Sequence, residues 1–479
     1  MTGTGAAALV VMAAVVGLCA VHREALRRVV LGTVDPRPLA LFRIALGLCL
    51  LSYVVEIAPL STYLFSDEGL LPSEAVPQVY GRGGLDGYGD GVRAPAGFEG
   101  PGAVLRHLTH GRWSLLYFWD SPAFVRAYLG GLVLACVGLV IGWRTRACTV
   151  AVWLLLCGLL RRGDAHWGGE QVFTGLLFPL MFARSGAAFG VDAWLRRRRL
   201  AGEGRLDPCD GPTAGRGAPP SPEHPQGRAA IVPRIPAWPQ VLLMAQLGLC
   251  YCANGWTKTG STWVSGDTLR LAVHLDRYTR LDWHALAVAL PSWTLQLASW
   301  SVLWWERLFP LLLVGLWLRA VDRAALPRLG ARARWSARAC WLVLAAALVV
   351  LASMPGALAE DPAIASRRAA AVTVGAAVIV GAVLLGGRLS PRGRRWITGV
   401  LAPRWWLGFG LAFHLTSLVL FEIGAFASAT ISAYLVCGAG PAAVRGVQRV
   451  ARALGRRGVP VPAHLRQPRP VALEDPALP

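Results

Sequence analysis

The chain has 479 residues, of which 54% are hydrophobic and 16% are charged. Its apolar runs are too numerous and too long for the core of a soluble protein of this size, which indicates a membrane protein. The net charge of +21 does not predict a nucleic-acid partner, because the arginines lie mostly in short loops between apolar runs, the pattern of membrane orientation.

The apolar runs predict an all-α polytopic membrane protein, a helical bundle with extracytoplasmic capping segments at 64–120 and 257–296. A spanning helix needs roughly 20 apolar residues, since the hydrocarbon is about 30 Å thick. We expect about eleven such helices by this rule. In chain order they lie near residues 5–21, 38–60, 122–142, 146–161, 168–184, 237–256, 297–318, 338–358, 369–386, 404–420 and 421–440.

Arginine bias predicts the orientation of these helices. The arginine-rich loops alternate along the chain and include the C-terminal tail, so all of them fall on one side, taken as cytoplasmic. We expect a multi-pass protein of the cell membrane with its N-terminus outside. The expected domains are N-terminal membrane helices (1–193), a disordered cytoplasmic linker (194–235), C-terminal membrane helices (236–440) and a basic cytoplasmic tail (441–479).

Lys258 is the single lysine among 48 basic residues, and it follows the apolar run at 237–256 in the stretch NGWTKTGSTWVSGDTL. The other basic residues in that count are all arginine, which indicates a strong compositional preference for arginine. A position that nevertheless keeps lysine can require an amine that loses its proton, because the arginine guanidinium stays protonated near neutral pH. Partial desolvation after an apolar helix favours the neutral amine. The alternative is a chance survivor that snorkels to the interface or pairs with a carboxylate. Composition alone divides the two interpretations evenly.

Further ionisable residues lie inside or at the edges of predicted spans and are candidates for one polar interior site, because each is costly in lipid unless paired. They are Glu56, Glu170, Glu306, His414 and Glu422. Glu306 could equally pair with Arg307 or another interfacial arginine, and His414 could be a satisfied core histidine. His107 and His110 are three residues apart but have no third ligand within reach in sequence, so we expect no metal site.

Five stretches, in the same order, resemble the membrane domain of the vitamin K-dependent gamma-carboxylase and the bacterial horizontally transferred transmembrane (HTTM) domain proteins. The first three are PLALFRIALGLCLLSYVVE from Pro38, GLVIGWRTR ending at Arg146, and GGEQVFTGLLF from Gly168, which continues toward Gly190-Val191-Asp192. The last two are Gly255–Gly266 and FHLTSLVLFEIGAF from Phe413.

The resemblance implies a role for Lys258, since the carboxylase lysine at this position is taken as the base that deprotonates vitamin K hydroquinone. With the ionisable residues of the predicted spans added, the candidate catalytic group is Lys258 as base with Glu170, His414 and Glu306 tuning it. The cofactor that the resemblance implies is a reduced quinone of the vitamin K or menaquinol type. The residues expected to bind that quinone are Trp263, Gly266 and Phe421.

The sequence also departs from the family. The histidine of the family's third stretch is replaced by Glu170, with His166 one turn earlier, and the large extracytoplasmic domain has no counterpart. Two extra spans appear at about 338–386. Carboxylation of peptide glutamates is therefore not implied.

Two function classes follow from these observations. The first is a membrane-embedded, carboxylase-like or quinol-dependent enzyme with Lys258 as general base. The second is a non-enzymatic membrane protein that binds a lipid or a partner protein, for example in peptide toxin production or export. A Lys258→Arg substitution separates them, because arginine preserves the charge but cannot act as a base. The expected partners are the lipid bilayer and a lipophilic quinone, and the sequence identifies no protein partner.

Overall fold

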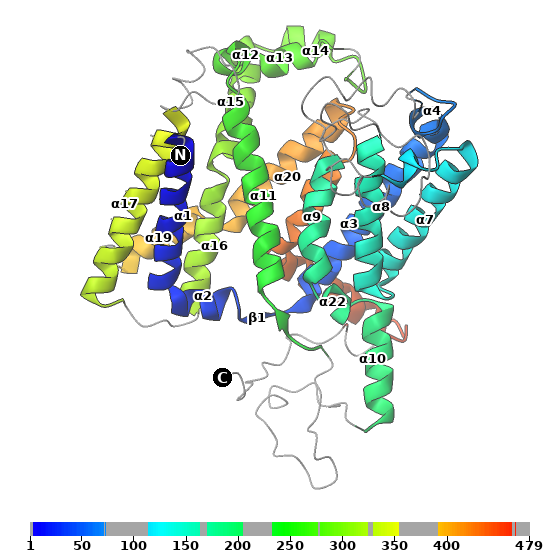
Figure 1. Cartoon of the computed structure of the whole chain (residues 1–479), viewed down its shortest axis with the longest axis horizontal. Coiled ribbons are helices and arrows are strands. Elements are labelled where there is room, and N and C mark those ends of the chain that lie inside the picture. Colours follow the sequence, from blue (N-terminus) through cyan, green and yellow to red (C-terminus); the bar gives the residue numbers. More distant parts are fainter. Residues whose placement is uncertain are drawn as a thin grey trace. The chain divides into compact units, whose positions relative to one another are not determined.

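The computed structural model describes residues 3–70, 72, 114–162, 170–204, 232–275, 278–323, 329–353, 391–461 and 465. Apart from a small sheet of two strands, β1 (Thr33–Val34) and β2 (Ile235–Pro236), the elements in these ranges are helices (Figure 1). The prediction of an all-α fold is confirmed. Contacts divide the chain into two compact units, Met1–Thr33 with Met244–Glu422, and Val34–Leu243 with Ile423–Pro479.

The second unit is organised around α3 (Pro36–Ile57), which begins with Asp35 as its N-cap: the Asp35 carboxylate accepts a hydrogen bond from the Arg37 backbone N–H. Leu39, Phe42 and Leu46 of α3 are fully or almost fully buried. The other main helices of the unit are α4 (Ser61–Phe65), α7 (Pro122–Ile141), α8 (Thr145–Arg162), α9 (Glu170–Phe182), α10 (Val191–Gly202), α21 (Phe426–Ala433) and α22 (Gly440–Arg456). Helices α7, α21 and α22 all contact α3.

A buried arginine joins three segments of this unit. Arg43 of α3 is 0% exposed and donates a hydrogen bond of 2.7 Å to the Phe189 carbonyl. Its guanidinium lies against Gly142 at the end of α7, where a side chain would collide with it. Asp192, which is in electrostatic range of Arg43, accepts hydrogen bonds of 2.8 Å from the backbone N–H groups of Arg144 and Thr145. We call this set the Arg43 junction; it consists of Arg43, Gly142, Arg144, Thr145, Phe189 and Asp192.

The first unit consists of early and late parts of the chain. Its main helices are α1 (Gly3–Val21), α2 (Arg23–Val29), the larger part of α11 (Trp238–Thr257), α12 (Ser261–Ser265), α13 (Thr268–Ala272), α14 (His284–Ala289), α15 (Ser292–Leu308), α16 (Pro310–Arg323), α17 (Ala331–Ser353), α19 (Pro391–Val400) and α20 (Pro403–Leu420). The first helix packs along α17, and α16 contacts α2, α19 and α20. Pro310, which cannot continue the hydrogen-bonding pattern of a helix, marks a 45° bend between α15 and α16.

Fewer helices qualify as membrane spans than the sequence predicts. Within the described residues, three are long and apolar enough to cross a membrane, and there are five if each of two bent pairs counts as one span. The three are Pro36–Phe65, Pro122–Ile141 and Phe426–Arg456, and the bent pairs are Leu9–Val21 with Arg23–Val29 and Ser292–Leu308 with Pro310–Ala320. These lengths and compositions support a multi-pass membrane protein.

The prediction of about eleven spans is therefore corrected. Three predicted spans show the physical reasons. Helix α8 carries three arginines, α9 has only 13 residues, and α11 includes the polar residues Gln240, Gln246 and Asn254. Sequence windows overlooked these polar residues and helix ends. The predicted span at 369–386 lies outside the described residues, as does most of the predicted capping segment at 64–120 and of the linker at 194–235.

Candidate functional site

Lys258 is the first residue after α11, and the end of that helix determines its position. The Thr257 hydroxyl donates to the Ala253 carbonyl at 2.9 Å, which closes the last turn. Gly255 lies so near α15 that a methyl group there would be 2.7 Å from the Arg307 backbone nitrogen. The absence of a side chain at Gly255 thus allows the end of α11 to approach α15, and it brings Lys258 to Glu306.

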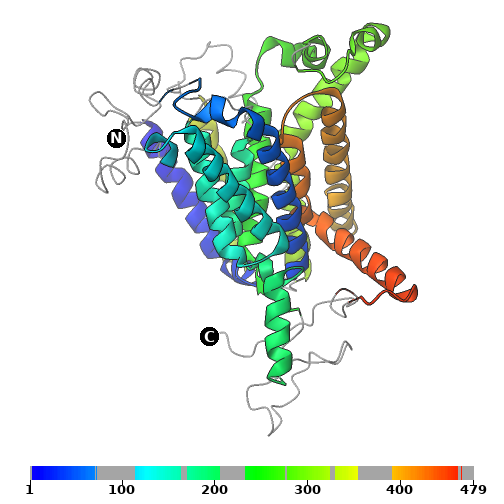
Figure 2. The same ribbon diagram turned by 90° about the vertical axis from the view of Figure 1, so that its right-hand side faces the viewer.

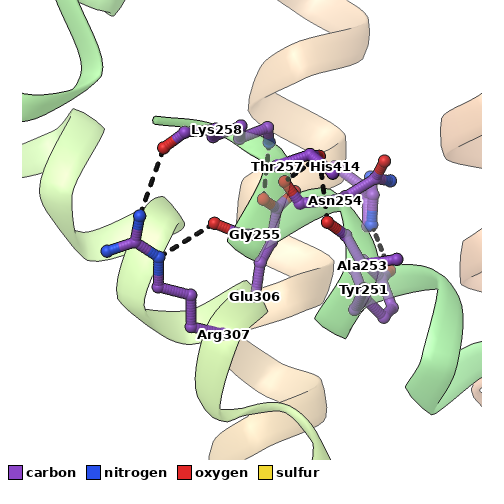
Figure 3. Close-up of polar contacts among 9 residues, drawn as sticks. All are labelled: Tyr251, Ala253, Asn254, Gly255, Thr257, Lys258, Glu306, Arg307 and His414. Atoms are coloured by element: carbon purple, nitrogen blue, oxygen red, sulfur yellow. Dashed lines mark hydrogen bonds and ion pairs between the residues drawn. The ribbon is translucent and has the colours of Figure 1, made fainter. Parts of the chain in front are cut away.

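Lys258 forms an ion pair with Glu306. Its Nζ donates to the Glu306 Oε2 at 2.5 Å, a short charge-assisted hydrogen bond (Figure 3). The Lys258 side chain is 25% exposed and that of Glu306 only 3%. Lys258 Nζ also lies 4.6 Å from the centroid of the Trp263 ring, within cation–π range. The amine is therefore accessible, while the carboxylate that pairs with it is buried.

Arg307 holds the segment that carries Lys258. Its Nε donates to the Gly255 carbonyl at 2.8 Å and its Nη2 to the Lys258 carbonyl at 3.1 Å. Its guanidinium also lies near the rings of Trp256 and Trp304, at 5.0 and 5.2 Å. Because Arg307 binds backbone carbonyls, the direct ion-pair partner of Glu306 is Lys258. The alternative in which Glu306 pairs directly with Arg307 is not what the structure contains.

A second polar pair lies next to this one. Tyr251 of α11 and His414 of α20 are both 0% exposed, and the Tyr251 hydroxyl is 2.5 Å from His414 Nε2. Trp305, the neighbour of Glu306, contacts both rings, with centroid distances of 4.8 Å to Tyr251 and 6.4 Å to His414. His414 also lies within electrostatic range of Lys258. Figure 3 shows the two pairs along the same end of α11.

Three of the four residues predicted as catalytic thus meet in one unit. Glu170 belongs to the second unit, where it is the first residue of α9 and 4% exposed. It lies in electrostatic range of Tyr53 of α3. Within the described residues its Oε2 has no hydrogen-bond partner.

The residues predicted to bind a quinone have different surroundings. Trp263 contacts the Lys258 amine. Gly266 adopts a positive φ of 82°, and a methyl group on it would lie 2.9 Å from the Trp300 ring, so glycine is required by both backbone and packing. Phe421 follows α20 and its backbone forms an isolated bridge with Thr279. Of the three, Trp263 is the one that touches the ion pair.

Tyr251 and Arg307 were not predicted as site residues. Tyr251 lies in the last two turns of α11, the helix that ends directly before Lys258, so the position of the lysine pointed to this end of the helix. The sequence indicates Arg307 only as a charge partner of Glu306, although the donors of its guanidinium can equally bind carbonyl groups.

Comparisons with family models, with characterised proteins and with solved structures give no significant match. Within the described ranges, no three His, Cys, Asp or Glu side chains are grouped in a way that could hold a metal ion. His107 and His110 lie outside these ranges.

The chemistry available at this site is proton transfer. A part-exposed primary amine is hydrogen-bonded to a buried carboxylate, and a buried tyrosine–histidine pair is close enough to respond to the charge on the amine. Each of these four groups can hold or release a proton. Trp263 lies against the amine, and Trp305 packs against the tyrosine and the histidine.

Proposed function

We propose that the chain is an integral membrane protein related to the HTTM and gamma-carboxylase group, in which the Lys258–Glu306 pair accepts a proton from a lipid-soluble reduced quinone. The observation that carries the proposal is the 2.5 Å hydrogen bond between a part-exposed amine and a buried carboxylate. The protein lies in the cell membrane as a multi-pass protein, with its N-terminus outside and its C-terminus in the cytoplasm.

The pair can accept a proton without an extra base. Moving one proton along the hydrogen bond turns the ammonium and carboxylate into a neutral amine and a carboxylic acid, with no change in total charge. Burial makes the charged carboxylate costly and brings the two forms closer in free energy. The exposed amine then takes a proton from an acidic hydroxyl beside it, and Glu306 keeps the proton it received.

The neighbouring residues position and insulate this exchange. Arg307 fixes the backbone on both sides of the last turn of α11 through two carbonyl groups. Trp263 offers a ring face next to the amine, where a flat aromatic molecule could stack. A reduced quinone would supply a phenol-type hydroxyl and, once deprotonated, reactivity toward oxygen. Lys258 and Trp263 are the two residues that would contact a reduced quinone. The proposal gives Glu170, Gly266 and Phe421 no role in the proton transfer.

Lys258→Arg tests the proposal most directly. The charge and the ion pair with Glu306 are retained, but a guanidinium does not release its proton near neutral pH. We expect the purified variant in proteoliposomes to bind a short-chain menaquinol with similar affinity and to lose at least about a hundredfold in its rate of turnover. Arg319→Lys is the matched control, because it exchanges arginine and lysine in α16, away from the Lys258–Glu306 pair. Its turnover should match that of the unmodified protein.

A labelling experiment tests binding independently of turnover. Lys258 carries the only side-chain amine of the chain, so an amine-reactive reagent reports on it directly once the N-terminal amine is blocked. We expect menaquinol to slow this labelling and a lipid of similar length without a quinone ring to leave it unchanged. Full turnover by the arginine variant together with unprotected labelling would remove the enzymatic proposal.

A non-enzymatic role is the second candidate function. It is favoured by the observation that the Lys258 ammonium already has its charge balanced by Glu306. Lys258 already has a carboxylate and a ring face as partners, an arrangement that also stabilises a binding surface for a lipid or a partner protein. In that case Lys258→Arg should preserve function, while loss of the charge in Lys258→Met should impair it.

A further inference from the structure

The residues of α22 are sorted by type around the helix. Val444, Gln448 and Ala451 are buried, on the side where α22 contacts α3. Four arginines at spacings of four, three and four residues fall on another single face. This arginine face consists of Arg445, Arg449, Arg452 and Arg456, all of them exposed.

An exposed apolar strip lies on the side of α22 away from the arginines. Val450 is 60% exposed and Leu454 is 40% exposed, although both are aliphatic residues. The helix contains no Asp or Glu. Within the described residues, none of the ion pairs involves the arginine face. The helix thus presents an apolar strip and an uncompensated positive face together.

The chain changes direction just before this helix. The apolar helix α21 is followed by a single π-helical turn, η4 (Leu435–Ala439), in which Gly438 has a φ of 121°, a conformation that favours glycine. Pro441 then occupies the first turn of α22. Figure 2 shows α22, in orange-red, running obliquely to α3. The whole stretch Phe426–Arg456 has 31 residues, more than the roughly 20 that cross a bilayer, so its basic end extends beyond the hydrocarbon.

We propose that the end of α22 that extends beyond the hydrocarbon lies at the surface of the bilayer and binds anionic phospholipid headgroups through the arginine face. The apolar strip reaches the boundary between headgroups and acyl chains, and the guanidinium groups bind phosphate oxygens with two parallel hydrogen bonds each. Each arginine near an anionic surface contributes about a fivefold increase in affinity. The inference depends on the membrane location proposed above, and it is independent of proton transfer at Lys258.

Hydrogen exchange of the full chain in lipid nanodiscs tests this inference. One set of nanodiscs contains phosphatidylcholine alone, and the other contains it with three parts in ten of phosphatidylglycerol. We expect the amides of 440–456 to exchange at least about tenfold more slowly in the anionic nanodiscs, since ligand binding stabilises the state that it binds. Raising the salt concentration to about 1 M should reduce the difference, because it screens surface charges.

Three variants separate charge from structure. Replacement of all four arginines of the face by glutamine should abolish the difference between the two nanodiscs, and replacement by lysine should preserve most of it. The matched control replaces four consecutive arginines of α10 by glutamine: Arg196, Arg197, Arg198 and Arg199. It removes the same amount of charge, but from positions that point in different directions around the helix and form no single face. That variant should behave like the unmodified chain.

The outcomes that overturn the inference differ from those that overturn the proposed function. Equal exchange in both nanodiscs, or a difference that survives the glutamine substitutions, would exclude lipid binding by the arginine face. Failure of the chain to enter phosphatidylcholine nanodiscs at all would instead contradict its membrane location. Slower exchange caused by soluble glycerol phosphate alone would identify a site for free phosphate in place of a lipid surface.

Discussion

Arg43 and Lys258 are both cations inside a helical unit, but their surroundings differ. Arg43 is 0% exposed and lies against the Phe189 carbonyl and Gly142. The carboxylate near it, Asp192, accepts hydrogen bonds from the backbone N–H groups of Arg144 and Thr145. Lys258 is part-exposed, and its partner is the buried carboxylate of Glu306. An enclosed cation can fix segments of the chain, whereas exchange of protons or ligands requires access.

The largest expected effect concerns the enclosed cation. Gly142 has a φ of 72°, and any side chain on it would meet the Arg43 guanidinium. Gly142→Val should therefore destabilise the protein by about 3 kcal/mol or more, through backbone strain and overpacking. Fluorescence-detected size-exclusion chromatography after heating measures this loss.

The control for this variant lies in the same helix. Apart from the backbone of its own helix, no atom lies within 4 Å of the position where a side chain on Gly130 of α7 would begin, so Gly130→Val should leave the melting temperature nearly unchanged. Equal stability of the two variants would show that the Arg43 junction does not hold the unit together.

The next effect concerns the accessible cation. Glu306→Gln leaves Lys258 without its charge partner and should cost about 1–3 kcal/mol of stability, together with quinol turnover. The double variant Lys258→Met with Glu306→Leu should recover most of the stability and none of the turnover, because a hydrophobic pair can replace a buried ion pair. Recovery of turnover in the double variant would contradict a role for the pair in proton transfer.

A smaller effect is expected at the second polar pair. Tyr251→Phe removes the 2.5 Å hydrogen bond to the buried His414 and should lower stability by about 1–2 kcal/mol. Tyr63→Phe, at a site that is 57% exposed, is the matched control and should be neutral. If thermal unfolding does not distinguish the two variants, the Tyr251–His414 pair does not stabilise the site.

The smallest effect should appear at the exposed rim of the Lys258 region. Hydrogen bonds from Ser265 and then Gln296 lower the pKa of Asp267 below its ordinary value of 3.8. Because the folded-state pKa is the lower one, the contribution to stability is present above about pH 4 and is lost as the pH falls through the lowered value. Comparison of melting temperatures between pH 7 and pH 2 for the protein and Asp267→Asn checks this, and the difference between the two proteins should shrink as the pH falls below about 4.

Much of the local structure could be predicted from the sequence. Helical content, the apolar character of α3 and α7 and the end of an apolar helix just before Lys258 follow from composition and periodicity, which depend on neighbouring residues. The number of spans was overpredicted because a run such as α9 is apolar but short, and because α8 carries arginines at both ends. Hydropathy windows average over such features.

The sequence by itself determined that the chain is α-helical and apolar, and that Lys258 is the one residue able to serve as a primary amine base. Only the tertiary structure decided which groups meet. Glu306 is 48 residues from Lys258, and His414 is 163 residues from Tyr251. Such pairs depend on which helix faces pack together and on close approaches such as that of Gly255 to α15. These contacts arise from the burial of surfaces distant in sequence, which no local pattern of residues encodes.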